Sequence, residues 1–289
     1  MAQRIVSPYD PDGVSWLRGN LHTHTTNSDG NITPQQAVDE YAALGYDFLM
    51  ISDHDRITRL DTLEPRGLAL VQGNEITSGG PHLLHVDADR VISPYADRQR
   101  VLDEINAGNG FAIMNHPNWE SHFNHCDQSV LEALRGYAGI EIFNGVTLRA
   151  EGCPLATDRW DMLLSRGRRV WGFANDDNHA DCDRGVAWNM VQCASRAAAD
   201  ILEALRCGVF YASTGVAIER IAASDDRIRI TAENCQCFDV IADDGRILAR
   251  INGPELDFAV PDDKSLTYLR VECHGHGAAQ AWTQPFFLE

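Results

Sequence analysis

The chain has 289 residues, 44% of them hydrophobic and 23% charged, which suits one large domain or a medium domain with an appendage. Its net charge of −18 argues against a nucleic-acid-binding surface. No apolar run approaches the roughly 20 residues of a membrane span, and the first residues lack the apolar core of a signal peptide. We therefore expect a cytoplasmic protein without a membrane segment.

The first two-thirds of the chain alternates short apolar runs with helical patterns, which predicts β/α units and a largely parallel sheet. A helix is expected from Pro34 to about Leu44, with Thr33 as N-cap and Gly45 at the C-terminal cap. Strands are predicted at residues 16–24, 48–51, 68–73, 82–86, 111–114, 140–143, 170–173 and 188–193. Further helices are predicted at 99–106, 129–134, 157–166 and 197–207, the last ending at Gly208.

From about Gly215 the pattern changes to short strands separated by turn sequences such as Asp-Asp-Gly and Asn-Gly-Pro. Seven strands are predicted, at residues 218–222, 228–232, 239–242, 247–251, 256–260, 268–273 and 281–287. Many short strands without a helix are typical of a small β-sandwich. The sequence therefore predicts two domains, a barrel-like domain at 1–213 and a β-sandwich at 214–289.

Histidines and carboxylates follow the predicted strands of the first domain. In a parallel β/α barrel these positions share the rim where active sites are built. Side chains two residues apart on a strand project to one side, so His22 and His24 can face one metal, as can Asp177 and His179. Nitrogen and oxygen ligands without thiolate suit Zn²⁺, Mn²⁺ or Fe²⁺. About eight such ligands are too many for one ion, which favours two or three metals with a carboxylate such as Glu75 as a bridge.

The order of these motifs resembles the polymerase and histidinol phosphatase (PHP) family over residues 16–190. The resemblance rests on Asn20-Leu21-His22-Thr23-His24-Thr25, Ser28-Asp29-Gly30, Ser52-Asp53-His54-Asp55, Gly73-Asn74-Glu75-Ile76-Thr77, Asn115-His116-Pro117 and Asp177-Asn178-His179. It implies a distorted (β/α)7 barrel with a di- or trinuclear centre, whose ligands are His22, His24, Asp29, His54, Glu75, His116, Asp177 and His179. Toward the C-terminus, Phe210-Tyr211-Ala212-Ser213-Thr214-Gly215 and Ala281-Trp282-Thr283-Gln284-Pro285 look like the carbaryl-hydrolase-like branch.

A ninth ligand is expected in the strand after Glu75, and His82 is favoured over His85. If His82 points to the rim, His85 three residues later faces the other way and is structural or supports a ligand. The chain departs from the family near residues 140–144. Many members carry a histidine or cysteine ligand there, whereas this chain offers Glu141 and Asn144, which puts the occupancy of one metal position in doubt.

The remaining polar motifs have competing interpretations. His122 and His125 are expected in a surface loop, with a lid over the substrate as the alternative. His274-Gly275-His276 repeats the His-x-His spacing but is flanked by glycines, so we interpret it as a hairpin turn. Either Asp53 or Asp55 is a candidate to orient a ligand imidazole. The catalytic candidates are Asp177, His179 and Arg184. Arg184 is a candidate to bind a phosphate through its planar guanidinium, with a surface salt bridge as the alternative. Arg18 and Arg56 are comparable candidates for binding a phosphate.

The favoured function is a phosphoesterase that uses a metal-bridging hydroxide on a small anionic phosphoester. The alternative is hydrolysis of a carboxylic or carbamic ester or an amide on the same centre, and a non-catalytic binding module is a third hypothesis. Binuclear amidohydrolases commonly bridge their metals with a carbamylated lysine. The only lysine is Lys264, outside the barrel region, so that bridge cannot form here.

Overall fold

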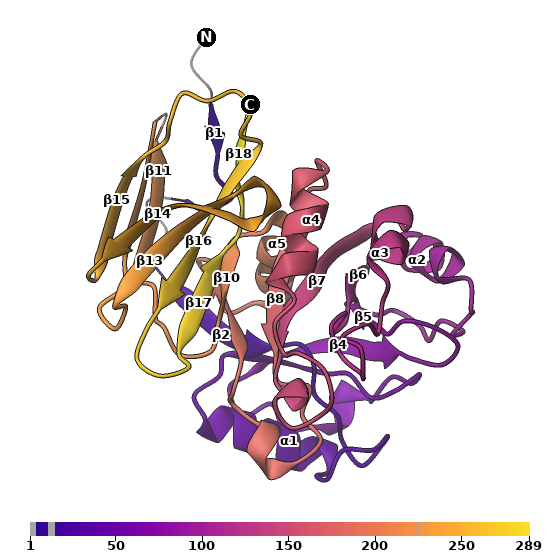
Figure 1. Ribbon diagram of the computed structural model, residues 1–289. Coiled ribbons are helices and arrows are strands. Elements are labelled where there is room, and N and C mark those ends of the chain that lie inside the picture. Colours follow the sequence, from indigo (N-terminus) through magenta and orange to yellow (C-terminus); the bar gives the residue numbers. More distant parts are fainter. Residues whose placement is uncertain (1–3, 11–14, 225) are drawn as a thin grey trace.

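The computed structural model describes residues 4–10, 15–224 and 226–289 (Figure 1). The described residues of the first part of the chain form the α-helices α1 (Pro34–Ala43), α2 (Arg98–Asn106), α3 (Gln128–Ala133), α4 (Thr157–Ser165) and α5 (Ala198–Cys207). Its strands are β1 (Ile5–Val6), β2 (Trp16–Asn20), β3 (Phe48–Ile51), β4 (Ala69–Ile76), β5 (Leu83–Val86), β6 (Phe111–Met114), β7 (Tyr137–Asn144), β8 (Trp171–Asn175), β9 (Trp188–Gln192) and β10 (Phe210–Ser213). Each helix and strand predicted for this part has a counterpart, within a few residues at its ends.

The helix ends follow the capping residues. Thr33 and Gln36 form a capping box at the start of α1, where the Thr33 side chain accepts from the Gln36 main-chain N–H. Gly208 ends α5 in the left-handed conformation, at φ +76°. A Cβ atom there would also lie 2.7 Å from the Trp171 ring, so both backbone and space require glycine.

The central sheet is mostly parallel. Strands β2, β3 and β4 pair in parallel, as do β6, β7 and β8, whereas β5 runs antiparallel to both β4 and β6. The β4–β5 connection spans only residues 77–82, too short for the crossover that a parallel pair requires. Because β5 is reversed, the residue just before it, His82, lies at the edge where β4 and β6 end.

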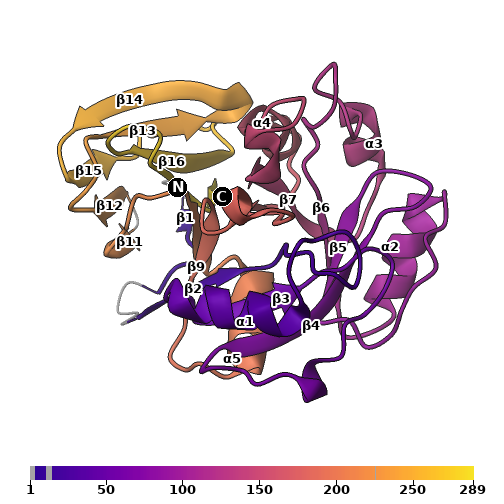
Figure 2. The same cartoon turned by 90° about the horizontal axis from the view of Figure 1, so that it is seen from below.

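Main-chain contacts also join the ends of β2 and β8. Thr23 and Asn178 form a parallel bridge, and the Asp177 N–H donates to His22 O over 3.0 Å. The two motifs most distant in sequence therefore meet at one edge of the sheet. In Figure 2, α1, α2 and α3 lie outside strands β3 to β7. A mixed α/β fold is confirmed; its finer description as a seven-stranded barrel stays a prediction.

The C-terminal part consists of strands β11 (Arg220–Ser224), β12 (Arg227–Thr231), β13 (Cys237–Ala242), β14 (Arg246–Asn252), β15 (Glu255–Ala259), β16 (Tyr268–His274), β17 (Gln280–Thr283) and β18 (Phe286–Leu288). The last predicted strand is divided in two at Gln284-Pro285, where proline cannot donate to a ladder. Strands β11, β12 and β15 form a separate sheet that shares a core with β13 and β16. These strands gather on one side of the molecule (Figure 2).

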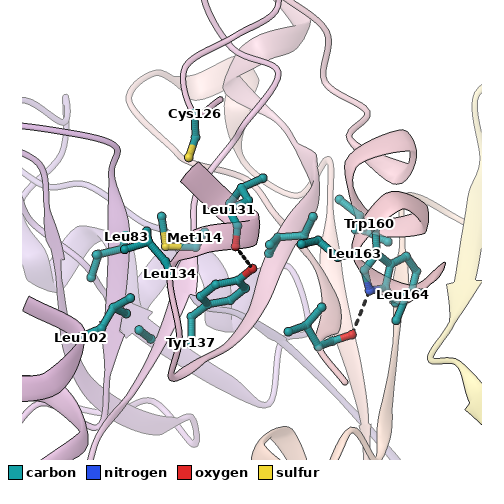
Figure 3. Close-up of a cluster of buried hydrophobic side chains, with 14 of the residues drawn as sticks. Leu83, Leu102, Met114, Cys126, Leu131, Leu134, Tyr137, Trp160, Leu163 and Leu164 are labelled. Atoms are coloured by element: carbon teal, nitrogen blue, oxygen red, sulfur yellow. Dashed lines mark hydrogen bonds between the residues drawn. The ribbon is translucent and has the colours of Figure 1, made fainter. Parts of the chain in front are cut away.

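Pairing of β10 with β17 connects the two parts through one continuous hydrogen-bonded path. The predicted domain division and the sandwich assignment therefore stay predictions. The core beside β6 and β7 is closely packed (Figure 3): the Tyr137 hydroxyl donates to Leu131 O over 2.6 Å, and Trp160 Nε1 donates to Val170 O over 2.9 Å. Within the described part of the chain, no helix has the length and apolar character needed to cross a membrane.

Candidate metal centre

The ends of the central strands bring together all nine residues that the sequence predicts as metal ligands. His22 and His24 follow β2, His54 follows β3, Glu75 lies at the end of β4, and His116 follows β6. Asp177 and His179 follow β8. His82 joins them from the start of the reversed strand β5, and Asp29 from the loop after His24.

Glu75 lies at the middle of the cluster and is only 1% exposed. Its two carboxylate oxygens face imidazole nitrogens from five histidines. The distances are 3.4 Å to His22 Nε2, 3.5 Å to His24 Nε2, 2.9 Å to His54 Nδ1, 3.2 Å to His82 Nδ1 and 3.4 Å to His116 Nε2. Such a position between separate groups of histidines is the one that a bridging carboxylate needs.

Two other carboxylates complete the arrangement. Asp177 Oδ1 lies 3.1 Å from His22 Nε2 and 3.2 Å from His24 Nε2. Asp29 Oδ1 lies 3.3 Å from both His54 Nε2 and His179 Nε2, although its side chain is 55% exposed. Asp177 therefore faces the buried side of the cluster, and Asp29 closes its outer side.

Several buried polar atoms here have no hydrogen-bond partner, namely His22 Nε2, His24 Nε2, His54 Nδ1 and Asp177 Oδ1. Leaving such atoms unsatisfied is costly in a folded protein. Two atoms that each lie about 2.1 Å from one ion in tetrahedral or octahedral geometry are about 3.0 to 3.4 Å apart. Most separations in the cluster are close to that range, so the donor set fits divalent cations.

Electrostatics favour positive charge at this position. Burial alone would lower the pKa of His22, but three surrounding carboxylates, Asp177 first among them, raise it well above its usual value. Burial opposes ionisation of Asp177, yet the neighbouring histidines lower its pKa. The raised pKa of His22 and the lowered pKa of Asp177 both show that positive charge is stabilised between these carboxylates. A bound metal ion supplies that positive charge in place of a proton.

Four overlapping groups of side chains have ligand atoms within 4.8 Å of one another. They are His24, Asp29, His54 and His179; His22, Glu75 and His116; His22, His24 and Asp177; and His82, His116 and His125. Because the first two groups share no residue, the cluster has room for more than one ion. The number and identity of the metals stay predictions.

Glu141, at the position where the chain departs from the family pattern, supports the cluster from outside. Its Oε1 lies 2.8 Å from His22 Nδ1, and its Oε2 accepts from the His116 main-chain N–H over 3.0 Å. A carboxylate in that position fixes the tautomer and orientation of a ligand imidazole. Asn144 in turn donates to Glu141 and to Asp177.

Asp53 and Asp55, the two candidates to orient a ligand imidazole, mainly bind loop residues. The Asp53 carboxylate accepts hydrogen bonds from Thr25, Ser28 and Thr58, and that of Asp55 accepts from Thr77 and Ser78. Both carboxylates therefore hold loops beside the cluster, and Asp53 reaches an imidazole only through Ser28, whose Oγ lies 3.4 Å from His24 Nδ1. Sequence adjacency to His54 is misleading because consecutive residues leaving a strand point in different directions.

His125 lies beside His82 and His116, and sequence reasoning did not place it at the centre. Its Nε2 accepts the His82 main-chain N–H over 3.0 Å, and its Nδ1 lies 3.0 Å from Glu120 Oε1. Both nitrogens are thus engaged, so His125 positions His82 and is not a free ligand. His85 is also fully buried, but it pairs with Asn74 and Ala112 in the ladder and is not part of the metal groups.

The structure does not bring Arg184 to the cavity above the cluster. Its guanidinium lies 2.5 Å from Glu40 Oε2 and 2.6 Å from Asp181 Oδ1, and it is not among the lining residues. Arg18 stacks on Trp188, 3.7 Å from the ring centroid, and Arg56 lines a separate cavity. Arg149 is the arginine that reaches the site, and no motif in the sequence marks it.

Two residues of the centre have left-handed backbone conformations that are unusual for side chains other than glycine. His116 has φ +24° and Asp177 has φ +53°. Such strain persists where surrounding contacts enforce it, and it is common at functional sites.

Comparisons with known proteins find one short sequence match and solved structures of similar fold. No family model matches the chain. A stretch of 99 residues is 33% identical to a 5′-3′ exoribonuclease of Haemophilus influenzae, covering 30% of this chain; the chain spans about a third, 36%, of that protein's length. A two-domain protein from Bacteroides vulgatus, containing a predicted PHP-like metal-dependent phosphoesterase, aligns over 99% of this chain and 90% of its own, with 18% identity and a TM-score of 0.54.

A second solved structure, of a putative metal-dependent phosphoesterase from Bifidobacterium adolescentis, aligns over 60% of this chain and 90% of its own, with 15% identity and a TM-score of 0.44. The likeness to the Bacteroides protein shows that the two chains share a fold. The resemblance of the C-terminal motifs to the carbaryl-hydrolase-like branch stays a prediction.

Proposed function

We propose that this protein is a metal-dependent hydrolase that acts on phosphoesters, with two or three divalent ions among the histidines and carboxylates. The observation that carries the proposal is the set of buried, unpartnered imidazole nitrogens facing Glu75 and Asp177. A cluster with only a structural role would have its polar atoms satisfied by hydrogen bonds.

The residues that would hold the ions are His22, His24, Asp29, His54, Glu75, His82, His116, Asp177 and His179. Bound divalent ions supply Lewis acidity and an activated water at neutral pH. Glu141 keeps the Nε2 atom of His22 directed at the centre by engaging its Nδ1. Asp177 and His179 line the cavity as well as the cluster, so they also contact whatever reacts there.

Two features favour a phosphoester among the bonds that such a centre could hydrolyse. The cavity is lined by the cluster together with one arginine, Arg149, which suits a group with several anionic oxygens. The relative in Haemophilus influenzae is named as an exoribonuclease, which cleaves phosphodiesters, and the protein with the shared fold is described as a predicted phosphoesterase.

The proposal is tested by metal analysis and a substrate panel. Protein purified without chelator should contain about two or three equivalents of Zn, Mn or Fe by elemental analysis. The same preparation should hydrolyse members of a panel of aryl phosphates, cyclic nucleotides and terminal nucleotides, and dialysis against chelator should abolish turnover. Rapid cleavage of aryl carboxylic or carbamic esters without turnover of any phosphoester would assign the centre to the alternative chemistry. A metal-free protein without hydrolytic activity would contradict both.

A further inference from the structure

The cavity above the candidate metal centre has two kinds of surface. Its volume is about 310 Å³, its floor consists of the histidines and carboxylates, and its walls carry Trp119, Val146, Arg149 and Ala150. These four wall residues come from two loops, after β6 and after β7. A cavity of this volume has room for a small organic ligand between the floor and the walls.

Arg149 is held in place before any ligand binds. Its Nε and Nη2 atoms donate to the two oxygens of Asp183 over 2.6 and 2.7 Å. Asp183 is 2% exposed and also accepts from the main-chain N–H groups of His179 and Ala180. Because a guanidinium is planar, its Nη1 group points away from Asp183 and stays available to an anion. Among the described residues that line the cavity, Arg149 is the only lysine or arginine.

Trp119 gives the cavity an aromatic wall on the side of His82 and His116. Its ring packs edge-on against His116, with ring centroids 5.0 Å apart and an angle of 77° between the planes. The main chain at Trp119 is fixed by a bridge to Gly152. Gly152 has φ +114°, and a Cβ atom there would lie 2.8 Å from Trp119 Cα, so the close approach of the two loops requires glycine. The half-buried indole is therefore held in place by its neighbours, and it lines the cavity.

We infer that the substrate is a phosphoester with a planar aromatic leaving group, which stacks on Trp119 while Arg149 binds a phosphoryl oxygen. The inference rests on the proposed function and narrows it. Arg149 adjoins the His179 side of the centre through Asp183, and Trp119 adjoins the His82 and His116 side. A phosphoryl group over the floor can thus contact Arg149 while its substituent reaches the indole.

The reaction consistent with this placement is simple hydrolysis. Water supplies the oxygen that bonds to phosphorus, the bond between phosphorus and the leaving oxygen breaks, and the aromatic alcohol departs with a proton from water. Stacking of a flat ring on an aromatic side chain contributes about tenfold in affinity. We therefore expect Trp119 to select the leaving group and Arg149 to select the anion.

The test measures binding of two non-hydrolysable probes, phenylphosphonate and methylphosphonate, to the metal-loaded protein by calorimetry. The wild-type protein should bind phenylphosphonate about tenfold more tightly. Trp119→Leu should remove this preference, and Trp119→Phe should keep most of it. Arg149→Gln should weaken both probes about tenfold and leave their ratio unchanged. Metal content, measured in every variant, should stay at the wild-type value.

Two control variants change similar side chains elsewhere. Phe123→Ala removes an exposed aromatic ring from the loop that carries Trp119, and Arg100→Gln removes an arginine on the outside of α2; both should bind the probes as the wild type does. Equal affinity of the wild type for the two probes, or a preference that survives in Trp119→Leu, would overturn the inference. Phenyl phosphate and methyl phosphate as substrates separate the two proposals when the ratio of their kcat/KM values is compared between the wild type and Trp119→Leu, because phenoxide is the better leaving group in both proteins. An unchanged ratio contradicts the aromatic selection alone, whereas absence of turnover for both substrates contradicts the proposed function.

Discussion

The segments His22-Thr23-His24 and His274-Gly275-His276 share one spacing and lie in different parts of the fold. His22 and His24 are fully buried, and their Nε2 atoms face carboxylates without a hydrogen-bond partner. In contrast, His274 lies on β16 with Nε2 at 3.2 Å from Asp239 Oδ2 and Nδ1 at 3.2 Å from Gln280 Nε2. His276 is exposed in the following turn. The predicted hairpin turn after β16 is thus present, and the state of the imidazole nitrogens distinguishes the two segments where spacing does not.

The largest effect should come from replacing one histidine of each segment. His22→Ala should remove at least one equivalent of metal and lower kcat/KM by roughly 100-fold or more, because a ligand to the buried centre is lost. His274→Ala should keep the wild-type metal content and activity and cost less than about 1 kcal/mol in unfolding free energy. Elemental analysis, kinetics and denaturant titration measure these quantities. Wild-type metal content and activity in His22→Ala would contradict the whole assignment of the centre.

Each of the two segments has a histidine in contact with a buried carboxylate, Glu141 at His22 and Asp239 at His274. Glu141→Gln should weaken metal binding about 10- to 100-fold, because the carboxylate that orients His22 is replaced by a neutral amide. Asp239→Asn is the matched control, since Asp239 is also buried and contacts His274, outside the centre. Competition with a chromophoric chelator measures the affinity. If both variants bind metal as tightly as the wild type, Glu141 has no role in positioning the ligand.

A smaller effect is expected in the loop after β6, which carries two histidines. His125→Gln should lower the affinity for one metal ion roughly tenfold and leave the others unchanged, because His125 holds the main chain at His82. His122 is exposed, so His122→Gln should have no effect on metal affinity. Stepwise metal titration of the chelator-treated protein resolves the separate ions. An equal response of the two variants would mean that the engaged nitrogens of His125 contribute nothing to the centre.

Much of this fold is specified locally, which explains why the sequence predicts it. The apolar run Phe48–Ile51 and the capping residues Thr33 and Gly45 determine their own strand and helix ends through nearby contacts. The ordered motifs likewise identify candidate ligands such as Glu75 and Asp177, because residues after successive strands share an edge of the sheet.

The supporting residues could not be predicted because they act across long sequence separations. Glu141 contacts His22 from 119 residues away, and Arg149 is held by Asp183 34 residues further on. A strand position or an arginine in a loop gives no local sign of such a partner. Proximity in sequence to His179 makes Arg184 a candidate phosphate clamp, yet its side chain turns away toward Glu40. The sequence thus identifies the candidate ligands better than the residues that orient them.

His85 is buried like His22 and His24, and neither of its nitrogens has a hydrogen-bond partner. It lies on β5, away from the candidate metal groups. Burial lowers the pKa of His85 to about 4, from an ordinary value of 6.5. A Cβ atom at Gly110 would lie 2.5 Å from its Nε2, so the imidazole is closely packed and stays neutral. An unpartnered nitrogen therefore indicates a metal site only where carboxylates face it.

The lowered pKa of His85 predicts how the free energy of unfolding depends on pH. As pH falls below about 6.5 the unfolded chain protonates His85 while the folded chain does not until about pH 4, so stability is lost across that interval. His85→Val should remove on the order of 2 kcal/mol of this acid-dependent loss and cost little at pH 8, where both states are neutral. Urea unfolding of chelator-treated wild type and variant from pH 8 to pH 4 measures the difference without a contribution from metal release. The prediction concerns how the free energy of unfolding changes with pH, so a packing defect introduced by valine would shift the whole curve equally. If the curves of the two proteins are parallel instead, His85 titrates alike in the folded and unfolded states.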